Sequence, residues 1–172
     1  MKILKTVMAT LWGAAILCPV AAQDNNTGKS RIFGAWEVVC PAKAGNRPCS
    51  LLQQQATTDA AGKKQRLLAI ELKPAGEMLQ GTMILPFGLD LSKGAQLHLP
   101  GELGSHHSFK TCLPVGCLVD VSFASASISA LSGAEKIEVE VTSQQSGQTT
   151  MLTIMLEGFA DALAAVRSGD LN

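Results

Sequence analysis

The sequence has 172 residues, of which 47% are hydrophobic, and it carries 14 basic and 14 acidic side chains. Balanced charge disfavours nucleic acids and anionic lipids as partners, because both require a basic patch on the protein. The length fits a single domain with its own hydrophobic core.

Residues 1–22 have the pattern of a secretory signal peptide. Two lysines precede an apolar run at residues 7–17, and Val20 and Ala22 place small residues at the −3 and −1 positions of a cleavage site. The run is shorter than the ~20 apolar residues of a transmembrane helix. We therefore expect cleavage near Ala22, a periplasmic or secreted protein, and a mature chain without a transmembrane segment.

Cys18 raises the alternative of a lipid-anchored protein, because a lipidated cysteine would stand at the end of the apolar run. Leu17 before it and Pro19 after it suit that processing poorly, so the ordinary signal peptide is preferred. Cleavage also removes two lysines and no acids, which leaves 12 basic and 14 acidic side chains in the mature chain.

Four cysteines remain in the mature chain: Cys40, Cys49, Cys112 and Cys117. An even number of cysteines in an exported chain indicates two disulfides, and four cysteines allow three connectivities. We favour the local pairs Cys40–Cys49 and Cys112–Cys117, because the members of each pair are close in sequence and flank turn-forming residues. The absence of Cys-Xaa-Xaa-Cys disfavours thioredoxin-like redox chemistry.

Alternation of apolar and polar residues predicts most of the chain to be strands. Residues 23–31 are polar and are expected to be a flexible mature N-terminus, with folding beginning near Ile32. The expected strands, in chain order, are residues 36–40, 49–57, 68–72, 78–85, 95–99, 117–123, 137–141 and 152–156. Residues 128–131 form a further short apolar element, which Gly133 closes.

The stretch at residues 109–123 combines a tight turn with a strand. Pro114 removes a backbone donor and Gly116 permits a positive φ, so residues 113–116 suit a reversal that a Cys112–Cys117 bridge could lock. We expect this cross-linked turn and strand to stabilise the edge of a β core.

The hydrophobic period changes near the C-terminus. Phe159, Ala162, Leu163 and Val166 fall at i, i+3, i+4 and i+7, which predicts a short amphipathic helix that ends near Gly169 and covers an end or edge of the sheets. The fold class is therefore mainly β: an antiparallel β-sandwich, or a barrel-like sheet, of about eight or nine strands with a short C-terminal helix. One domain is expected over residues 32–169.

Candidate metal ligands are few. His98, His106, His107 and Cys112 are residue types that bind zinc, but adjacent histidines on a strand point to opposite faces, so solvated loop histidines are preferred. We expect no metal and no cofactor.

Catalytic motifs are also missing from the sequence, which contains no Gly-Xaa-Ser-Xaa-Gly, His-Glu-Xaa-Xaa-His or phosphate-binding glycine loop. Asp90 and Asp120 could form an acid pair, yet they are better explained as solubilising charges. We assign no catalytic residue and expect no enzymatic activity.

Four short motifs follow one another along the chain: Phe-Gly-Ala-Trp-Glu-Val-Val-Cys at residues 33–40, Leu-Pro-Phe-Gly-Leu at 85–89 with Gly94, the second cysteine pair, and Leu-Glu-Gly-Phe at 156–159 with Ala162 and Leu163. Together and in this order they resemble the invasion-associated locus B family of bacterial exported proteins. The likeness covers about residues 32–167. It departs at Ala35, where members often have an acidic residue, and at residues 127–132, which do not align.

The resemblance implies a secreted or periplasmic β-sandwich that is associated in some bacteria with invasion of host cells and has no recognised catalytic residue. We therefore expect an exported, non-enzymatic envelope or interaction protein whose partner is an envelope or host-surface protein. The alternatives are a binder of a small apolar ligand inside the sandwich, and a hydrolase or redox enzyme. An exposed apolar patch would favour the first, an enclosed pocket the second, and converging perturbed acids or histidines the third.

Processing gives the first testable prediction. The intact mass of the exported protein should correspond to a chain that begins at Gln23, because Val20 and Ala22 fit the small-residue positions of the cleavage site. A mass that includes a diacylglycerol on Cys18 would contradict this cleavage.

Overall fold

The computed structural model describes residues 28–42, 48–58, 62–102, 104–169 and 171. The expected signal peptide, Cys18 and residues 23–27 of the expected flexible N-terminus lie outside these ranges. The first strand begins at Lys29, three residues before the predicted start at Ile32, because residues 29–31 pair with the following strand.

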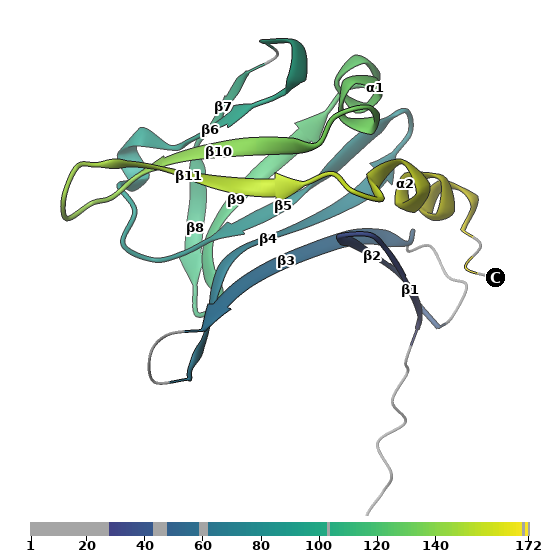
Figure 1. Ribbon diagram of the computed structural model, residues 1–172, viewed down its shortest axis with the longest axis horizontal. Coiled ribbons are helices and arrows are strands. Elements are labelled where there is room, and N and C mark those ends of the chain that lie inside the picture. The colour runs from purple at the N-terminus through teal and green to yellow at the C-terminus, as the bar shows by residue number, and fades with distance from the viewer. Residues whose placement is uncertain (1–27, 43–47, 59–61, 103, 170, 172) are drawn as a thin grey trace, which may run out of the picture.

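Eleven strands of the described residues form two antiparallel sheets that enclose one hydrophobic core (Figure 1). The larger sheet has the order β1–β2–β3–β4–β5–β9–β8 and the smaller sheet the order β11–β10–β6–β7. The larger sheet contains β1 (Lys29–Phe33), β2 (Trp36–Cys40), β3 (Ser50–Thr58), β4 (Lys64–Ala75), β5 (Met78–Leu85), β8 (Phe109–Leu113) and β9 (Gly116–Phe123). The smaller sheet contains β6 (Ala95–His98), β7 (Ser105–His107), β10 (Lys136–Thr142) and β11 (Thr149–Met155).

The helices are short and connect or cap the strands. They are η1 (Leu91–Lys93), η2 (Pro100–Glu102), α1 (Ser125–Ser132) and α2 (Phe159–Ser168). None of the helices in the described part of the chain is long and apolar enough to cross a membrane.

The expected mainly β, antiparallel fold with a short C-terminal helix is confirmed. All eight strands that alternation predicted are present, and the apolar element at residues 128–131 belongs to helix α1. The three further strands are β1, β7 and β8, in which every described side chain is exposed or only half-buried. An edge strand without a buried face carries no alternating pattern, so the sequence could not reveal these three.

Helix α2 closes one end of the sandwich through a close contact between two backbone turns. Gly158 has φ 78°, and a Cβ atom built on it would lie 2.2 Å from the carbonyl oxygen of Phe33. A Cβ on Gly34 would lie 2.6 Å from the carbonyl oxygen of Glu157, and the Ala35 N–H donates to that same oxygen at 3.0 Å. Both turns therefore require glycine, for conformation and for close approach.

Two aromatic rings fill the space behind this contact. Trp36 and Phe159 are each 1% exposed, and their ring centroids are 5.2 Å apart in a tilted arrangement. The Trp36 Nε1–H donates to the Met155 carbonyl at 2.9 Å, so the buried indole has the hydrogen bond that it needs. The start of the larger sheet is thus joined to the last strand of the smaller one.

Glutamine side chains of β3 cover the outer edge of β11. Gln53, which is 4% exposed, donates to the Met155 carbonyl at 2.6 Å and accepts from the Met155 N–H at 3.0 Å. Gln55 donates to the Thr153 carbonyl. An edge strand presents unpaired N–H and C=O groups that can template aggregation, and these amides satisfy part of that edge within the molecule.

The cap formed by α2 gives a prediction about stability. Phe159→Ala should lower the free energy of unfolding by roughly 3–5 kcal/mol, because it removes a large buried ring that contacts Trp36. Asp161→Ala, on the exposed face of the same helix, should cost less than about 1 kcal/mol, the scale of a first-turn charge. Urea unfolding of both variants measures the difference. Equal stabilities would mean that α2 is a detachable element and not a cap.

Candidate functional site

A gap opens at one end of the larger sheet, at the opposite end from helix α2. Strand β5 pairs with β4 as far as Ala69↔Ile84, whereas β4 continues beside β3 back to Lys64. Residues 64–67 of β4 therefore have no strand partner on the β5 side among the described strands. Helix α2 lies at the other end of the sheet, where Arg167 donates to the Glu77 carbonyl in the β4–β5 turn.

The gap exists because β5 leaves the larger sheet and its chain joins the smaller one. Pro86 follows the last residue of β5 and has no N–H to continue the ladder. The chain is then held at the end of β10: the Gln144 N–H donates to the Gly88 carbonyl and the Asp90 N–H to the Thr142 carbonyl, both at 2.8 Å. Backbone hydrogen bonds thus fix the point of departure.

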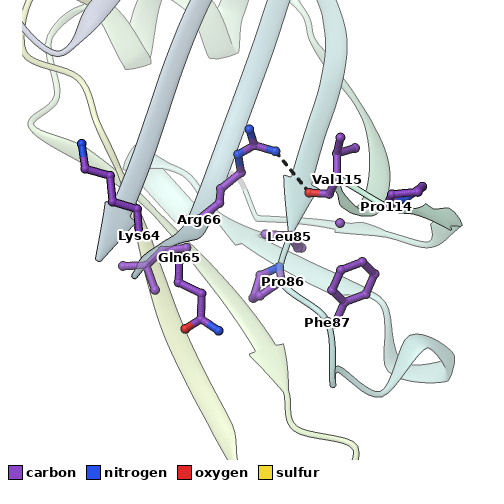
Figure 2. A pocket seen from close by; sticks show the side chains of 10 residues that line it. Lys64, Gln65, Arg66, Leu85, Pro86, Phe87, Pro114 and Val115 are labelled. Carbon is purple, nitrogen blue, oxygen red and sulfur yellow. Dashed lines mark hydrogen bonds between the residues drawn. The ribbon is translucent and has the colours of Figure 1, made fainter. Parts of the chain in front are cut away.

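Three segments line the resulting depression, which we call the sheet-end groove: residues 64–67 of β4, residues 85–87 after β5, and residues 114–116 of the β8–β9 turn (Figure 2). Its volume is about 590 Å³, within the range of sites that bind ligands. The groove lies outside the sandwich, whose interior is filled by side chains that are almost fully buried.

Apolar side chains are exposed at the rim of the groove. Phe87 is 61% exposed, Val115 52% and Leu67 38%. Figure 2 shows Phe87, Pro114 and Val115 on one side of the groove, and Lys64 and Gln65 on the other. Large apolar side chains that gather at a concave surface are typical of an interaction site.

Arg66 crosses the groove from β4 to the β8–β9 turn. Its Nη1 donates to the Val115 carbonyl at 3.2 Å (Figure 2), while its Nε is buried without a hydrogen-bond partner among the described residues. Lys64 adds a second positive charge, and none of the ten lining residues is acidic. The groove therefore combines apolar surface with positive charge.

The β8–β9 turn is held firmly against its neighbour. A disulfide joins Cys112 to Cys117, and Leu113 pairs with Gly116 around the two-residue turn. A Cβ on Gly116, which has φ 136°, would lie 2.5 Å from the Leu85 carbonyl oxygen. The tight turn and the strand after it that were expected within residues 109–123 are thus present, and the turn forms one wall of the groove. The other local disulfide, Cys40–Cys49, links β2 to the segment before β3.

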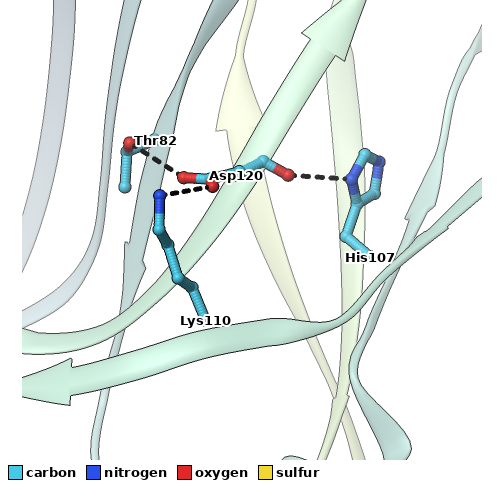
Figure 3. Close-up of polar contacts among 4 residues, drawn as sticks. All are labelled: Thr82, His107, Lys110 and Asp120. Atoms are coloured by element: carbon cyan, nitrogen blue, oxygen red, sulfur yellow. Dashed lines mark hydrogen bonds and ion pairs between the residues drawn. The ribbon is translucent and has the colours of Figure 1, made fainter.

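A polar cluster on the outer face of β9 is the second candidate (Figure 3). Lys110 donates to Asp120 Oδ2 at 2.8 Å, Thr82 donates to Asp120 Oδ1 at 3.5 Å, and the His107 ring donates from Nδ1 to the Asp120 carbonyl at 3.0 Å. Both side chains of the ion pair are more than half exposed. Exposed pairs of this kind contribute little energy, and the cluster ties neighbouring strands together without bringing a second acid to Asp120.

The candidate metal ligands from the sequence have separate partners. His98 lies 2.9 Å from a Glu140 oxygen, and His106 donates to the Lys93 carbonyl at 2.9 Å. The Cys112 sulfur is held in its disulfide and offers no thiolate. Within the described ranges, no three groups of metal-binding type come together.

Asp90, the other member of the considered acid pair, caps helix η1. It accepts hydrogen bonds from the Ser92 hydroxyl at 2.6 Å and the Ser92 N–H at 3.1 Å. The Ser92 hydroxyl is the main cause of the lowered pKa of Asp90, which therefore stays ionised at neutral pH. Asp90 and Asp120 thus have separate structural roles.

Sequence reasoning missed Arg66, Phe87 and the groove as a whole. Pro86 after an apolar run indicated the end of a strand, but the sequence held no sign that β4 continues beside the vacated position. A gap in a sheet is a relation between strands, and a single strand's pattern does not encode it.

Comparison with known proteins gives a consistent set of relatives. The family model described as "Invasion associated locus B (IalB) protein" matches residues 36–167. An invasion protein B homolog of Brucella abortus strain 2308 is 36% identical over 134 residues, which cover 77% of this chain and 76% of the relative. The invasion protein B of Bartonella bacilliformis is 29% identical over 160 residues, covering 90% of this chain and 84% of the relative.

A solved structure has the same fold. The crystal structure of invasion associated protein B from Bartonella henselae superimposes with a TM-score of 0.72, covering 81% of this chain and 95% of that one, at 22% sequence identity. At that identity the likeness concerns the architecture.

The disulfide at the groove gives a stability prediction. Replacing both cysteines, Cys112→Ser with Cys117→Ser, should lower the free energy of unfolding by roughly 2–3 kcal/mol, because the bridge closes a short loop and constrains the unfolded chain. Urea unfolding followed by circular dichroism measures the loss. An unchanged free energy would show that the β8–β9 ladder alone holds the turn.

Proposed function

Because the chain belongs to the invasion-associated locus B family, we propose that it is an exported protein without enzymatic activity that acts by binding another protein. The binding surface is the sheet-end groove with its rim of exposed apolar side chains. The compartment is the periplasm or the outside of the cell.

The sheet-end groove is the observation that carries this proposal. Phe87 and Val115 expose more than half of their surface beside a hollow of about 590 Å³. Water contact at such side chains is unfavourable by about 25 cal/mol for each Å² of apolar area, so covering them with a partner releases free energy. The disulfide and the crossover to β10 hold the walls in place, which limits the entropy lost on binding.

Export is supported by two independent features of the chain. Residues 1–22 have the charge, apolar run and small residues of a secretory signal peptide. The Cys40–Cys49 and Cys112–Cys117 disulfides suit an oxidising compartment such as the periplasm or the extracellular space.

The absence of enzymatic activity is an inference from how the polar groups are used. His98 faces Glu140, His106 binds a backbone carbonyl and Asp120 is paired with Lys110. Each group thus serves a local contact, and catalysis would need several of them to converge on one point. The relatives are named invasion proteins, and on that ground a role in invasion is part of the proposal.

A pull-down with variants tests this function. The mature protein, residues 23–172, should retain an envelope or host-surface protein, and Phe87→Ser with Val115→Ser should abolish retention because the apolar rim is lost. Met151→Ser is the matched control: Met151 is 44% exposed, but it lies on β11 of the other sheet.

Retention that survives the rim variant would contradict the groove as the binding surface. Melting temperatures of all variants should be measured alongside, because both rim side chains are exposed and their loss should leave the fold intact.

A further inference from the structure

We propose that the sheet-end groove binds an extended peptide segment of its protein partner, which adds as a strand to the free edge of β4 and places a carboxylate against Arg66 and Lys64. This inference rests on the proposed function, since it names the chemistry of the partner at the same site.

The width of the gap suits a single extended chain. β4 and the β8–β9 hairpin stand on either side of the position that β5 vacates after Leu85. Neighbouring strands lie about 4.7–4.9 Å apart, so the two walls are about two strand spacings from each other. Just beyond Leu85 this spacing leaves room for one extended chain, as β5 shows where it still lies between β4 and β9.

The backbone of β4 offers hydrogen bonds to such a strand. Lys64, Gln65 and Arg66 pair with β3 on one side only, Leu67 lies at a bulge before Leu68, and the described chain places no strand on the other side. A free strand edge presents N–H and C=O groups at the spacing that an added strand uses. Residues 64–66, which lie in the regular ladder with β3, set the length of the contact.

Charge selects an acidic residue in the segment. Lys64 and Arg66 contribute two positive charges, and no acid lines the groove to neutralise them. The Arg66 Nε is a buried donor without a partner in the described structure, which is unfavourable for a charged guanidinium. A carboxylate that shifts the guanidinium away from the Val115 carbonyl can bind it through two parallel hydrogen bonds.

The apolar rim selects the neighbouring side chains. Successive residues of a strand point to opposite faces, so a segment that pairs with β4 can direct every second side chain toward Phe87 and Val115. The segment that fits therefore has an Asp or Glu, with β-branched or aromatic residues two positions away.

A peptide library provides the test. A displayed library of random linear dodecapeptides is selected against the mature protein, residues 23–172, and one enriched peptide is synthesised with its acidic residue and with the corresponding amide. Binding is measured by fluorescence anisotropy to the wild type, Arg66→Met, Lys64→Gln and, as a control, Arg167→Met on helix α2. Hydrogen exchange then reports on the amides of residues 64–67.

The proposal expects enriched peptides that share an acidic residue among β-forming residues. Arg66→Met and the amide peptide should each weaken binding by about tenfold or more, the scale of a charge-assisted hydrogen bond. Lys64→Gln should weaken it less, Arg167→Met should leave it unchanged, and exchange at residues 64–67 should slow in the complex.

Other results would overturn the proposal and separate it from the proposed function. No enrichment, acid-free enriched peptides, or unchanged exchange at residues 64–67 would each contradict a strand with a carboxylate. If the pull-down nevertheless depends on Phe87 and Val115, the partner binds the rim through a surface other than an extended acidic segment. If the pull-down does not depend on them, the proposed function itself fails.

Discussion

The contact between the Phe33–Gly34 turn and the Glu157–Gly158 turn determines how the two sheets close. Neither turn tolerates a Cβ at its glycine, because the carbonyl oxygen of the other turn occupies that space. The close approach places Trp36 against Phe159 and brings Met155 within reach of Trp36 and Gln53. Strands from the two ends of the sequence are thereby locked together, and helix α2 is set over the end of the core.

The end of the larger sheet away from α2 is built on a different principle. There a strand is missing, because β5 stops at Pro86 and its chain bonds to the end of β10. The core does not need this position, since Leu68 and Leu85 are already buried beneath it. The sheet can therefore leave an open groove without loss of the hydrophobic core, and a recognition surface can occur on an otherwise closed sandwich.

The motifs that resemble the family divide between these two ends. Gly34, Trp36, Gly158 and Phe159 form the closed end, where they are needed for packing, while residues 85–89 and the Cys112–Cys117 pair lie at the groove. Residues of the closed end that match the family therefore indicate a shared fold. The second group positions Phe87 and Val115, which line the groove together with Arg66 and Lys64 of β4.

The sequence by itself determined the fold class, eight of the strands, the C-terminal helix and the family, because a buried face imposes a period on the chain and glycines mark turns that no other residue can form. Local cysteine spacing also indicated the two disulfides that the structure contains. The sequence did not predict the edge strands β1, β7 and β8, because none of their described side chains is fully buried. Only the tertiary structure showed that Gln53 donates a hydrogen bond to β11 and that Arg66 spans a groove to the Val115 carbonyl. It also showed that Asp90 and Asp120 have separate partners. The Gln53 and Arg66 contacts depend on where two segments far apart in the sequence meet, and the side-chain period along one segment carries no information about which other segment lies beside it.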